Sequence, residues 1–219
     1  MKSPDKTIRD IDRTLNERYS GRLERFGDDP RTLGWDTRAS QQVRFALACR
    51  EIDFDGKTVL DVGCGLADFR SYLSESGHDC SRYVGVDINP DLLIECQQKC
   101  PHDTFLTGNL LIDELPDAKA DCGVMFGVLN FRFSNMDNLT FAKSMITAAF
   151  ARVNQALVFD LLTVIRDETY PEEDFVYYYN PADILDFVFT LTPHVTLRHD
   201  YASIPQREMM FCLRKHAAT

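Results

Sequence analysis

Two carboxylates stand at the ends of apolar runs, where each could hold a polar ligand. Asp61 lies in Val59-Leu60-Asp61-Val62, which reads as a short buried strand, and the turn Gly63-Cys64-Gly65 follows directly. Asp87 closes a second apolar run, Tyr83-Val84-Gly85-Val86. A strand, a glycine turn and an acid at the tip of the next strand are typical of a nucleoside-binding site.

Two nucleoside ligands compete for a turn of this kind. A dinucleotide site needs the pattern GxGxxG, but its third glycine falls on Asp68, whose charge would repel a pyrophosphate at the start of the helix. S-adenosylmethionine has no phosphate and carries a sulfonium and an ammonium group, which suit an acidic loop. The turn therefore favours S-adenosylmethionine. We expect Asp61 to accept from its ammonium group and Asp87 from both ribose hydroxyls.

Apolar periodicity and turn residues outline the elements that must position these groups. We expect helices over residues 5–26, 38–50, 68–76, 138–152 and 182–190, and one more that opens at Pro90 behind an Asn89 cap. We expect strands over residues 58–62, 83–87, 104–106, 122–126, 156–162, 194–199 and 208–214. The last two are close enough in sequence to pair antiparallel.

This alternation predicts an α/β fold with a doubly wound, mostly parallel seven-stranded sheet whose last strand is antiparallel. Residues 1–52 are expected to form an N-terminal helical lid and residues 53–219 the nucleoside-binding core. Ligands of such sheets bind at the carboxyl ends of the strands.

The motifs resemble those of class I methyltransferases that depend on S-adenosylmethionine, including small bacterial members. The matching segments are Leu60-Asp61-Val62-Gly63-Cys64-Gly65, Val84-Gly85-Val86-Asp87, Gly108-Asn109 and Phe126-Gly127. The resemblance implies S-adenosylmethionine as cofactor and S-adenosylhomocysteine as product. It also implies that Asn109 can pair with the amino edge of the adenine and that the backbone of Phe126 and Gly127 holds the methionine amine. Two residues differ from the pattern of the family. Asn109 stands where an aspartate is common, and Ala67 stands where a glycine is often found.

The expected cofactor-binding residues come from the strand ends and from the N-terminal helices. They are Trp35, Arg44, Asp61, Gly63, Cys64, Gly65, Asp87, Ile88, Asn109, Leu110, Phe126 and Gly127. His199, Tyr178 and Asn130 are the candidate catalytic residues, because an imidazole, a phenol and an amide could orient or deprotonate an acceptor. Structural alternatives remain, with His199 bonded beside Asp200 and Arg44 on a helix surface.

Composition narrows the class of partner. The net charge is −10 and its acidic excess lies beyond residue 50, so a nucleic-acid partner is not expected. No apolar run reaches the ~20 residues that cross a bilayer, and the seven cysteines are spread along the chain. We therefore expect a cytoplasmic protein with reduced thiols and no membrane contact. Cys96, Cys100 and His102 form only a weak zinc pattern, so no metal is expected.

The expected function is transfer of a methyl group to a small metabolite or natural product without a metal. Such an in-line displacement depends mainly on aligning the reactants and excluding water. Residues 127–131 lack the Asn/Asp-Pro-Pro-aromatic pattern associated with methylation of adenine or glutamine amides. A methyltransferase acting on protein or RNA, and a non-catalytic module that binds S-adenosylmethionine, remain alternatives. The acceptor atom and the oligomeric state, monomer or homodimer, stay open.

Overall fold

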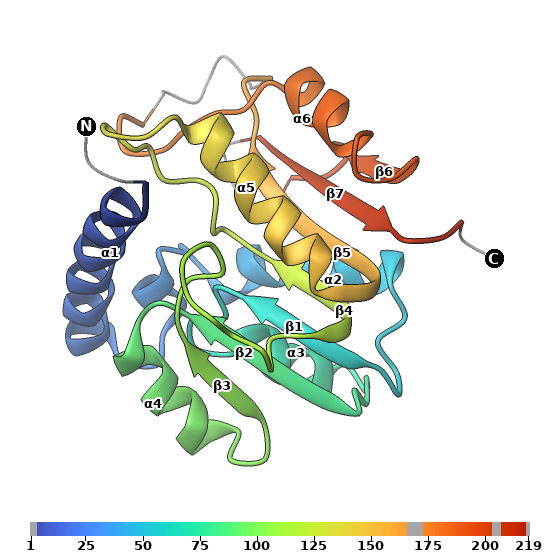
Figure 1. Ribbon diagram of the computed structural model, residues 1–219. Helices are drawn as coiled ribbons and strands as arrows, with labels where there is room; N and C mark the ends of the chain where they lie inside the picture. The colour runs from blue at the N-terminus through green and yellow to red at the C-terminus, as the bar shows by residue number, and fades with distance from the viewer. Residues whose placement is uncertain (1–3, 166–172, 203–206, 218–219) are drawn as a thin grey trace.

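A computed structural model describes residues 4–165, 173–202 and 207–217 (Figure 1). Its strands are β1 (Thr58–Val62), β2 (Arg82–Asp87), β3 (Thr104–Thr107), β4 (Ala120–Met125), β5 (Val153–Leu162), β6 (His194–Arg198) and β7 (Glu208–Arg214). Its helices are α1 (Pro4–Phe26), the 3-10 helix η1 (Pro30–Leu33), α2 (Arg38–Glu51), α3 (Asp68–Glu75), α4 (Pro90–Lys99), α5 (Asn138–Ala151) and α6 (Pro181–Val188). No helix of the described part is both long and apolar enough to cross a membrane.

The strands form one seven-stranded sheet in the order β3-β2-β1-β4-β5-β7-β6. Strand β1 pairs in parallel with both β2 and β4, whereas β7 runs antiparallel to β5 and β6. The chain moves outward from β1 to β3 and then returns to β4 on the other side of β1. This reversal of strand order opens a crevice at the carboxyl ends of β1 and β4. The predicted fold class is confirmed.

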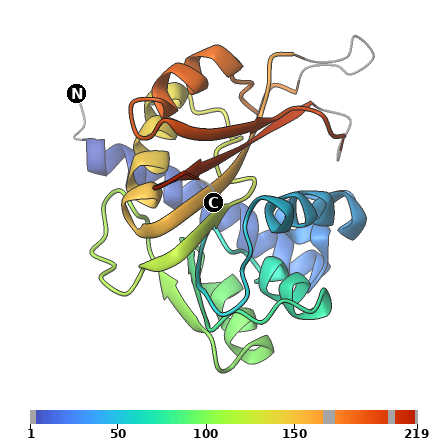
Figure 2. The same cartoon turned by 90° about the vertical axis from the view of Figure 1, so that its right-hand side faces the viewer.

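Side-chain alternation along β1 gives the sheet two apolar faces. Leu60 belongs to the core on the side of α5 and α6, where Met145 and Ile184 are also buried. Val59 belongs to the core on the opposite side, with Phe45 of α2 and Phe69 of α3. Figure 2 shows α5 and α6 on one side of the sheet and α2 and α3 on the other.

The element boundaries agree with the sequence-based expectation except at a few ends. The Thr37 side chain accepts from the Ser40 amide and caps α2, and Asn89 caps α4 in the same way. Strand β5 begins at Val153, not at residue 156, because Val153 pairs with Ala120 across an irregularity in β4. The 3-10 helix η1 was not expected; Asp29 caps it by accepting from the Arg31 amide. Residues 166–172, in the connection between β5 and α6, lie outside the described residues.

The two N-terminal helices take different positions. Helix α1 stands beside α4 at the edge of the molecule in Figure 1. Its apolar residues Ile8 and Ile11 are buried. Helix α2 packs on the sheet through Phe45, Leu47 and Ala48. Of the segment expected to form a lid, α1 is therefore the helix that leaves the sheet face and lies over the strand ends.

Candidate functional site

The turn after β1 folds tightly over the end of β2. The Gly63 and Cys64 amides both donate to the Val86 carbonyl, at 2.7 and 3.1 Å. Gly63 has φ +72, and a Cβ on it would lie 2.4 Å from Val128 Cγ2. Gly65 has φ +55, and its Cβ would lie 2.7 Å from Leu33 Cδ1. Both glycines are therefore required by backbone conformation and by close approach.

Asp87 joins this turn to the start of α4. Its carboxylate accepts from the Gly65 amide and from the Asn89 amide, each at 2.9 Å. Burial raises the pKa of Asp87, while these backbone donors act to lower it. Each carboxylate oxygen can accept more than one hydrogen bond, so the group can also receive ligand hydroxyls.

Asp61 lies behind the turn with an exposed fraction of 3%. The Tyr83 hydroxyl donates to its Oδ2 atom. Burial raises the pKa of Asp61 to about 7 against the opposing effect of that hydrogen bond, and the charges of Asp87 and Asp68 raise it further. A cation that binds nearby would favour the charged carboxylate.

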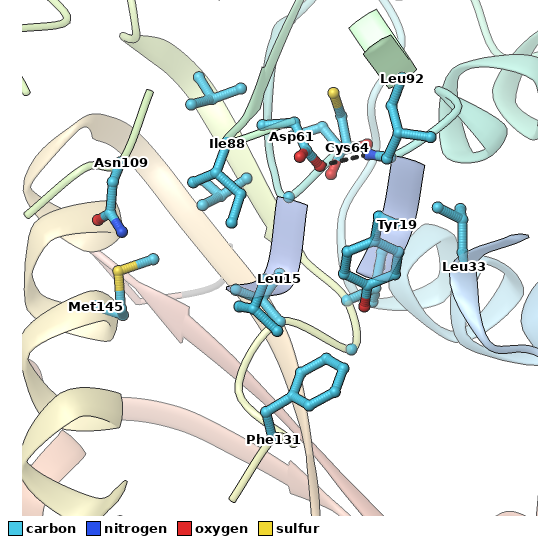
Figure 3. A pocket seen from close by; sticks show the side chains of 18 of the residues that line it. Leu15, Tyr19, Leu33, Asp61, Cys64, Ile88, Leu92, Asn109, Phe131 and Met145 are labelled. Carbon is cyan, nitrogen blue, oxygen red and sulfur yellow. Dashed lines mark hydrogen bonds between the residues drawn. The ribbon is translucent and has the colours of Figure 1, made fainter. Parts of the chain in front are cut away.

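One pocket covers the turn and the carboxyl ends of β1 to β4 (Figure 3). The predicted cofactor-binding residues that line it are Trp35, Asp61, Gly63, Cys64, Gly65, Asp87, Ile88, Asn109, Leu110, Phe126 and Gly127. In Figure 3, Asn109 and Met145 lie at one end and Leu33 at the other, with Leu15 and Tyr19 of α1 between them. The arrangement is a cleft with acidic groups on its floor and α1 as its cover.

Arg44 is the one residue of the predicted cofactor set outside the pocket lining. It is fully buried, and its Nε atom lies 3.1 Å from Asp160 Oδ2 and 2.9 Å from Glu208 Oε1. Trp35 separates it from the pocket, with the guanidinium carbon 3.9 Å from the ring centroid. Two buried carboxylates already pair with its guanidinium, so Arg44 is not expected to bind the cofactor carboxylate.

The three candidate catalytic residues also lie away from the pocket lining. Asn130 Oδ1 accepts from the Leu162 amide at 3.0 Å, so this side chain joins the loop after β4 to the end of β5. Tyr178 is buried in a small cluster with Leu162 and Val176. His199 follows β6, and β5 and β7 lie between β6 and β4 in the sheet. Its Nε2 atom is buried without a hydrogen-bond partner in the described part of the chain.

Several pocket residues were not identified from the sequence. Asp12, Leu15 and Tyr19 line the pocket from α1, and Gln41 lines it from α2. The sequence does indicate that one face of α1 is buried, because apolar residues recur along it at helical spacing. They are Ile8, Ile11, Leu15, Tyr19 and Leu23. That period showed which face of α1 is covered, but not which part of the molecule covers it.

The pocket carries an aromatic wall beside the acidic floor. Phe131 lines the pocket, and the Tyr19 ring meets it edge to face at a centroid distance of 6.2 Å. Phe133 and Phe141 also line the pocket, with their rings edge to face at a centroid distance of 5.0 Å. Burial raises the pKa of Tyr19 to about 12. Tyr19 is therefore a neutral phenol at physiological pH.

The cysteines contribute to packing near the turn. Cys96 is fully buried in α4, and its thiol donates to the Gly65 carbonyl at 3.1 Å. All seven cysteines are free thiols. Among the described residues, no group of three or more His, Cys, Asp and Glu side chains is arranged to hold a metal ion.

Comparisons with known proteins agree with this geometry. Residues 59–156 match a protein-family model described as a methyltransferase domain. The structure of magnesium protoporphyrin IX methyltransferase from Synechocystis PCC 6803 with bound SAH is similar, with a TM-score of 0.67 and 19% identity over 96% of this chain and 100% of that chain. No curated protein matches the sequence.

Two further solved structures share the fold. The DhpI-SAH complex has a TM-score of 0.61 and 15% identity, over 90% of this chain and 95% of that chain. The pyocyanin biosynthetic protein PhzM has a TM-score of 0.61 and 13% identity, over 90% of this chain and 62% of that chain.

Proposed function

We propose that this chain, a class I methyltransferase by its domain family over residues 59–156 and by its fold, transfers a methyl group from S-adenosylmethionine to a small, largely apolar acceptor. The observation that carries the proposal is the joining of the glycine turn to Asp87. The Gly65 amide and the Asp87 carboxylate are hydrogen-bonded to each other on the floor of one pocket. This fixes a carboxylate where the ribose of a nucleoside can meet it.

The donor set of the pocket fits S-adenosylmethionine. Asp87 would accept from the ribose hydroxyls, and the buried Asp61 would face the ammonium group. The space over Gly63 and Gly65, which a Cβ would fill, would take the chain of the methionine. Ile88 and Leu110 would flank the adenine at the end near Asn109. When bound, the cofactor supplies an electrophilic methyl group.

The remaining side chains of the pocket are mostly apolar, which favours an apolar acceptor. Leu15, Val128 and Phe131 line the pocket beside the turn, and the Tyr19 hydroxyl is a polar group among them. Because Tyr19 remains protonated at neutral pH, we propose that it orients the acceptor and does not act as a base. Helix α1 would exclude water from the reaction. The names of two of the similar structures mention ring compounds: one is a magnesium protoporphyrin IX methyltransferase and the other a pyocyanin biosynthetic protein.

We also infer a cytoplasmic protein that works on small molecules and not on nucleic acid. The free thiols suit a reducing compartment. The net charge of −10 opposes contact with a phosphate backbone.

Calorimetry with S-adenosylhomocysteine tests the cofactor assignment. We expect wild-type protein to bind it, and Asp87→Ala to bind about tenfold or more weakly because hydrogen bonds to a charged acceptor are lost. Asp117→Ala changes an exposed aspartate outside the pocket and should leave the affinity unchanged. No binding by wild-type protein, or equal binding by Asp87→Ala, would contradict the assignment.

Transfer of labelled methyl groups tests the acceptor. Purified protein with S-adenosylmethionine should methylate members of a panel of small aromatic acids, phenols and amines. Labelling of bulk RNA or of a protein extract instead would favour the macromolecular alternative. Cofactor binding with no transfer to any of these would favour a non-catalytic module.

A further inference from the structure

Both polar atoms of the Asn109 side chain are hydrogen-bonded within the protein. Its Nδ2 atom donates to Asp12 Oδ1 at 3.0 Å, and its Oδ1 atom accepts from the Leu111 amide at 3.0 Å. The Asn109 amide donates to Asp113 Oδ2 at 2.8 Å. Asn109 therefore holds the loop after β3 together and anchors α1. Its Oδ1 atom already accepts one hydrogen bond and carries no charge, so it is a weaker acceptor for a base than a carboxylate.

Asp12 offers a charged and therefore stronger acceptor beside Asn109. It lies on α1, is partly buried and lines the pocket at the Asn109 end. Within residues 4–165, 173–202 and 207–217, no hydrogen bond or ion pair reaches its Oδ2 atom. The nearby cation Arg9 pairs with Asp113 at 3.1 Å and not with Asp12. Asp12 is thus a half-buried residue of the pocket lining with a carboxylate oxygen that can accept a hydrogen bond.

The position of this carboxylate identifies the ligand group that it meets. In the proposed function, Asp87 at the end of β2 accepts from the ribose, so the base extends toward the neighbouring β3. Asn109 and Leu110 follow β3 and line that end of the pocket. An adenine lying there presents one strong donor, its exocyclic amino group. Burial and the Asp113 charge raise the pKa of Asp12, and a ligand donor would offset part of that cost.

We propose that Asp12 of α1 accepts a hydrogen bond from the exocyclic amino group of the cofactor adenine. The inference rests on the proposed function, because it assumes an adenosyl ligand. Asp12 is also hydrogen-bonded to Asn109 of the core. Recognition of the base and seating of α1 over the pocket would then be one event, since the same carboxylate bonds to both.

Comparing the affinities of two ligands distinguishes recognition of the adenine by Asp12 from anchoring of α1 by Asp12. The probes are S-adenosylhomocysteine and its 6-deamino analogue, whose purine carries hydrogen in place of the amino group. Wild-type protein should prefer S-adenosylhomocysteine by about tenfold or more, as expected for a charge-assisted hydrogen bond. Asp12→Ala should reduce that preference to near unity. Alanine favours helix, so α1 should persist, as circular dichroism would verify.

Two further variants complete the test. Glu17→Ala removes an exposed carboxylate from the same helix, outside the lining of the cofactor pocket, and should keep the wild-type preference. Asp12→Asn retains a neutral acceptor and should give an intermediate preference. If Asp12→Ala weakens both ligands equally, Asp12 only anchors α1 and the inference is overturned. If wild-type protein binds neither ligand, the proposed function itself fails.

Discussion

Gly127 shows how closely single residues are fitted around the pocket. It follows β4 with φ +70, and its amide donates to Asp160 Oδ1 at 2.7 Å. A Cβ at this position would lie 2.8 Å from Trp35 Cζ2. The Trp35 ring cannot withdraw easily, because the Arg44 guanidinium lies 3.9 Å from the ring centroid. Any side chain at residue 127 would therefore move Trp35 within the pocket wall.

We expect Gly127→Ala to weaken S-adenosylhomocysteine binding about tenfold or more. Positive φ alone costs an alanine about 1–2 kcal/mol of stability. Gly77→Ala is a matched control, since Gly77 has φ +81 and no atom within 4 Å of an added Cβ. It should lose similar stability and no affinity. Calorimetry and thermal denaturation of both variants would measure the two effects, and equal affinities would contradict the role given to Trp35.

Helix α2 is tied to the sheet by a buried ionic cluster of Arg44, Asp160 and Glu208. The three residues come from α2, β5 and β7, and each is at most 2% exposed. Two carboxylates share one guanidinium, which also donates to the Ser40 carbonyl at 2.7 Å. Asp160 in turn accepts from the Gly127 amide. The cluster thereby connects three core elements to the pocket end of β4.

Replacing Arg44 by a neutral residue should strongly destabilise the protein. We expect Arg44→Met to lower the free energy of unfolding by about 3–5 kcal/mol, because buried carboxylates lose their partner. Arg70→Met is the control; Arg70 pairs with Asp103 at 2.7 Å but has a side chain 26% exposed, so its loss should cost below about 1 kcal/mol. Urea denaturation would compare them. Should Arg44→Met fail to fold, adding Asp160→Asn and Glu208→Gln should restore folding, and equal costs for the two arginines would refute the prediction.

The buried aspartates Asp61 and Asp160 affect how the stability of the protein depends on pH. Burial raises the pKa of Asp61 to about 7, and burial with the Glu208 charge raises the pKa of Asp160. In the unfolded chain both carboxyls titrate near ~3.9. Between about pH 4 and 7 the native state therefore binds more protons than the unfolded state. These two groups make the free energy of unfolding decrease as pH rises through that window.

We expect wild-type protein to lose more stability between pH 5 and pH 8 than the variant Asp61→Asn/Asp160→Asn. The comparison is needed because other carboxyls act in the opposite direction; Asp29, for example, has its pKa lowered to about 2 by Arg31. Urea denaturation of both proteins at the two pH values would give the difference. Parallel losses would show that the two carboxyls do not titrate in this range.

The elements and the pocket residues at the strand ends were predictable because their signals are local. Strand β1, the turn at Gly63 and Gly65, and the caps at Thr37 and Asn89 each depend on residues within a few positions of one another. Alternation of strands and helices then leaves few possible sheet orders. This is why the fold and the pocket residues on the strand ends could be read from the chain.

The set of elements and the carboxylates at their ends therefore follow from the amino-acid sequence alone. Which distant residues meet depends on tertiary packing. Arg44 and Glu208 are 164 positions apart, and Asp12 and Asn109 are 97 apart; no local pattern pairs them. The strand order likewise sets His199 beyond β5 and β7 from the pocket. Contacts of this kind depend on which helix and sheet faces pack against each other. The periodicity of one helix shows only that one of its faces is buried.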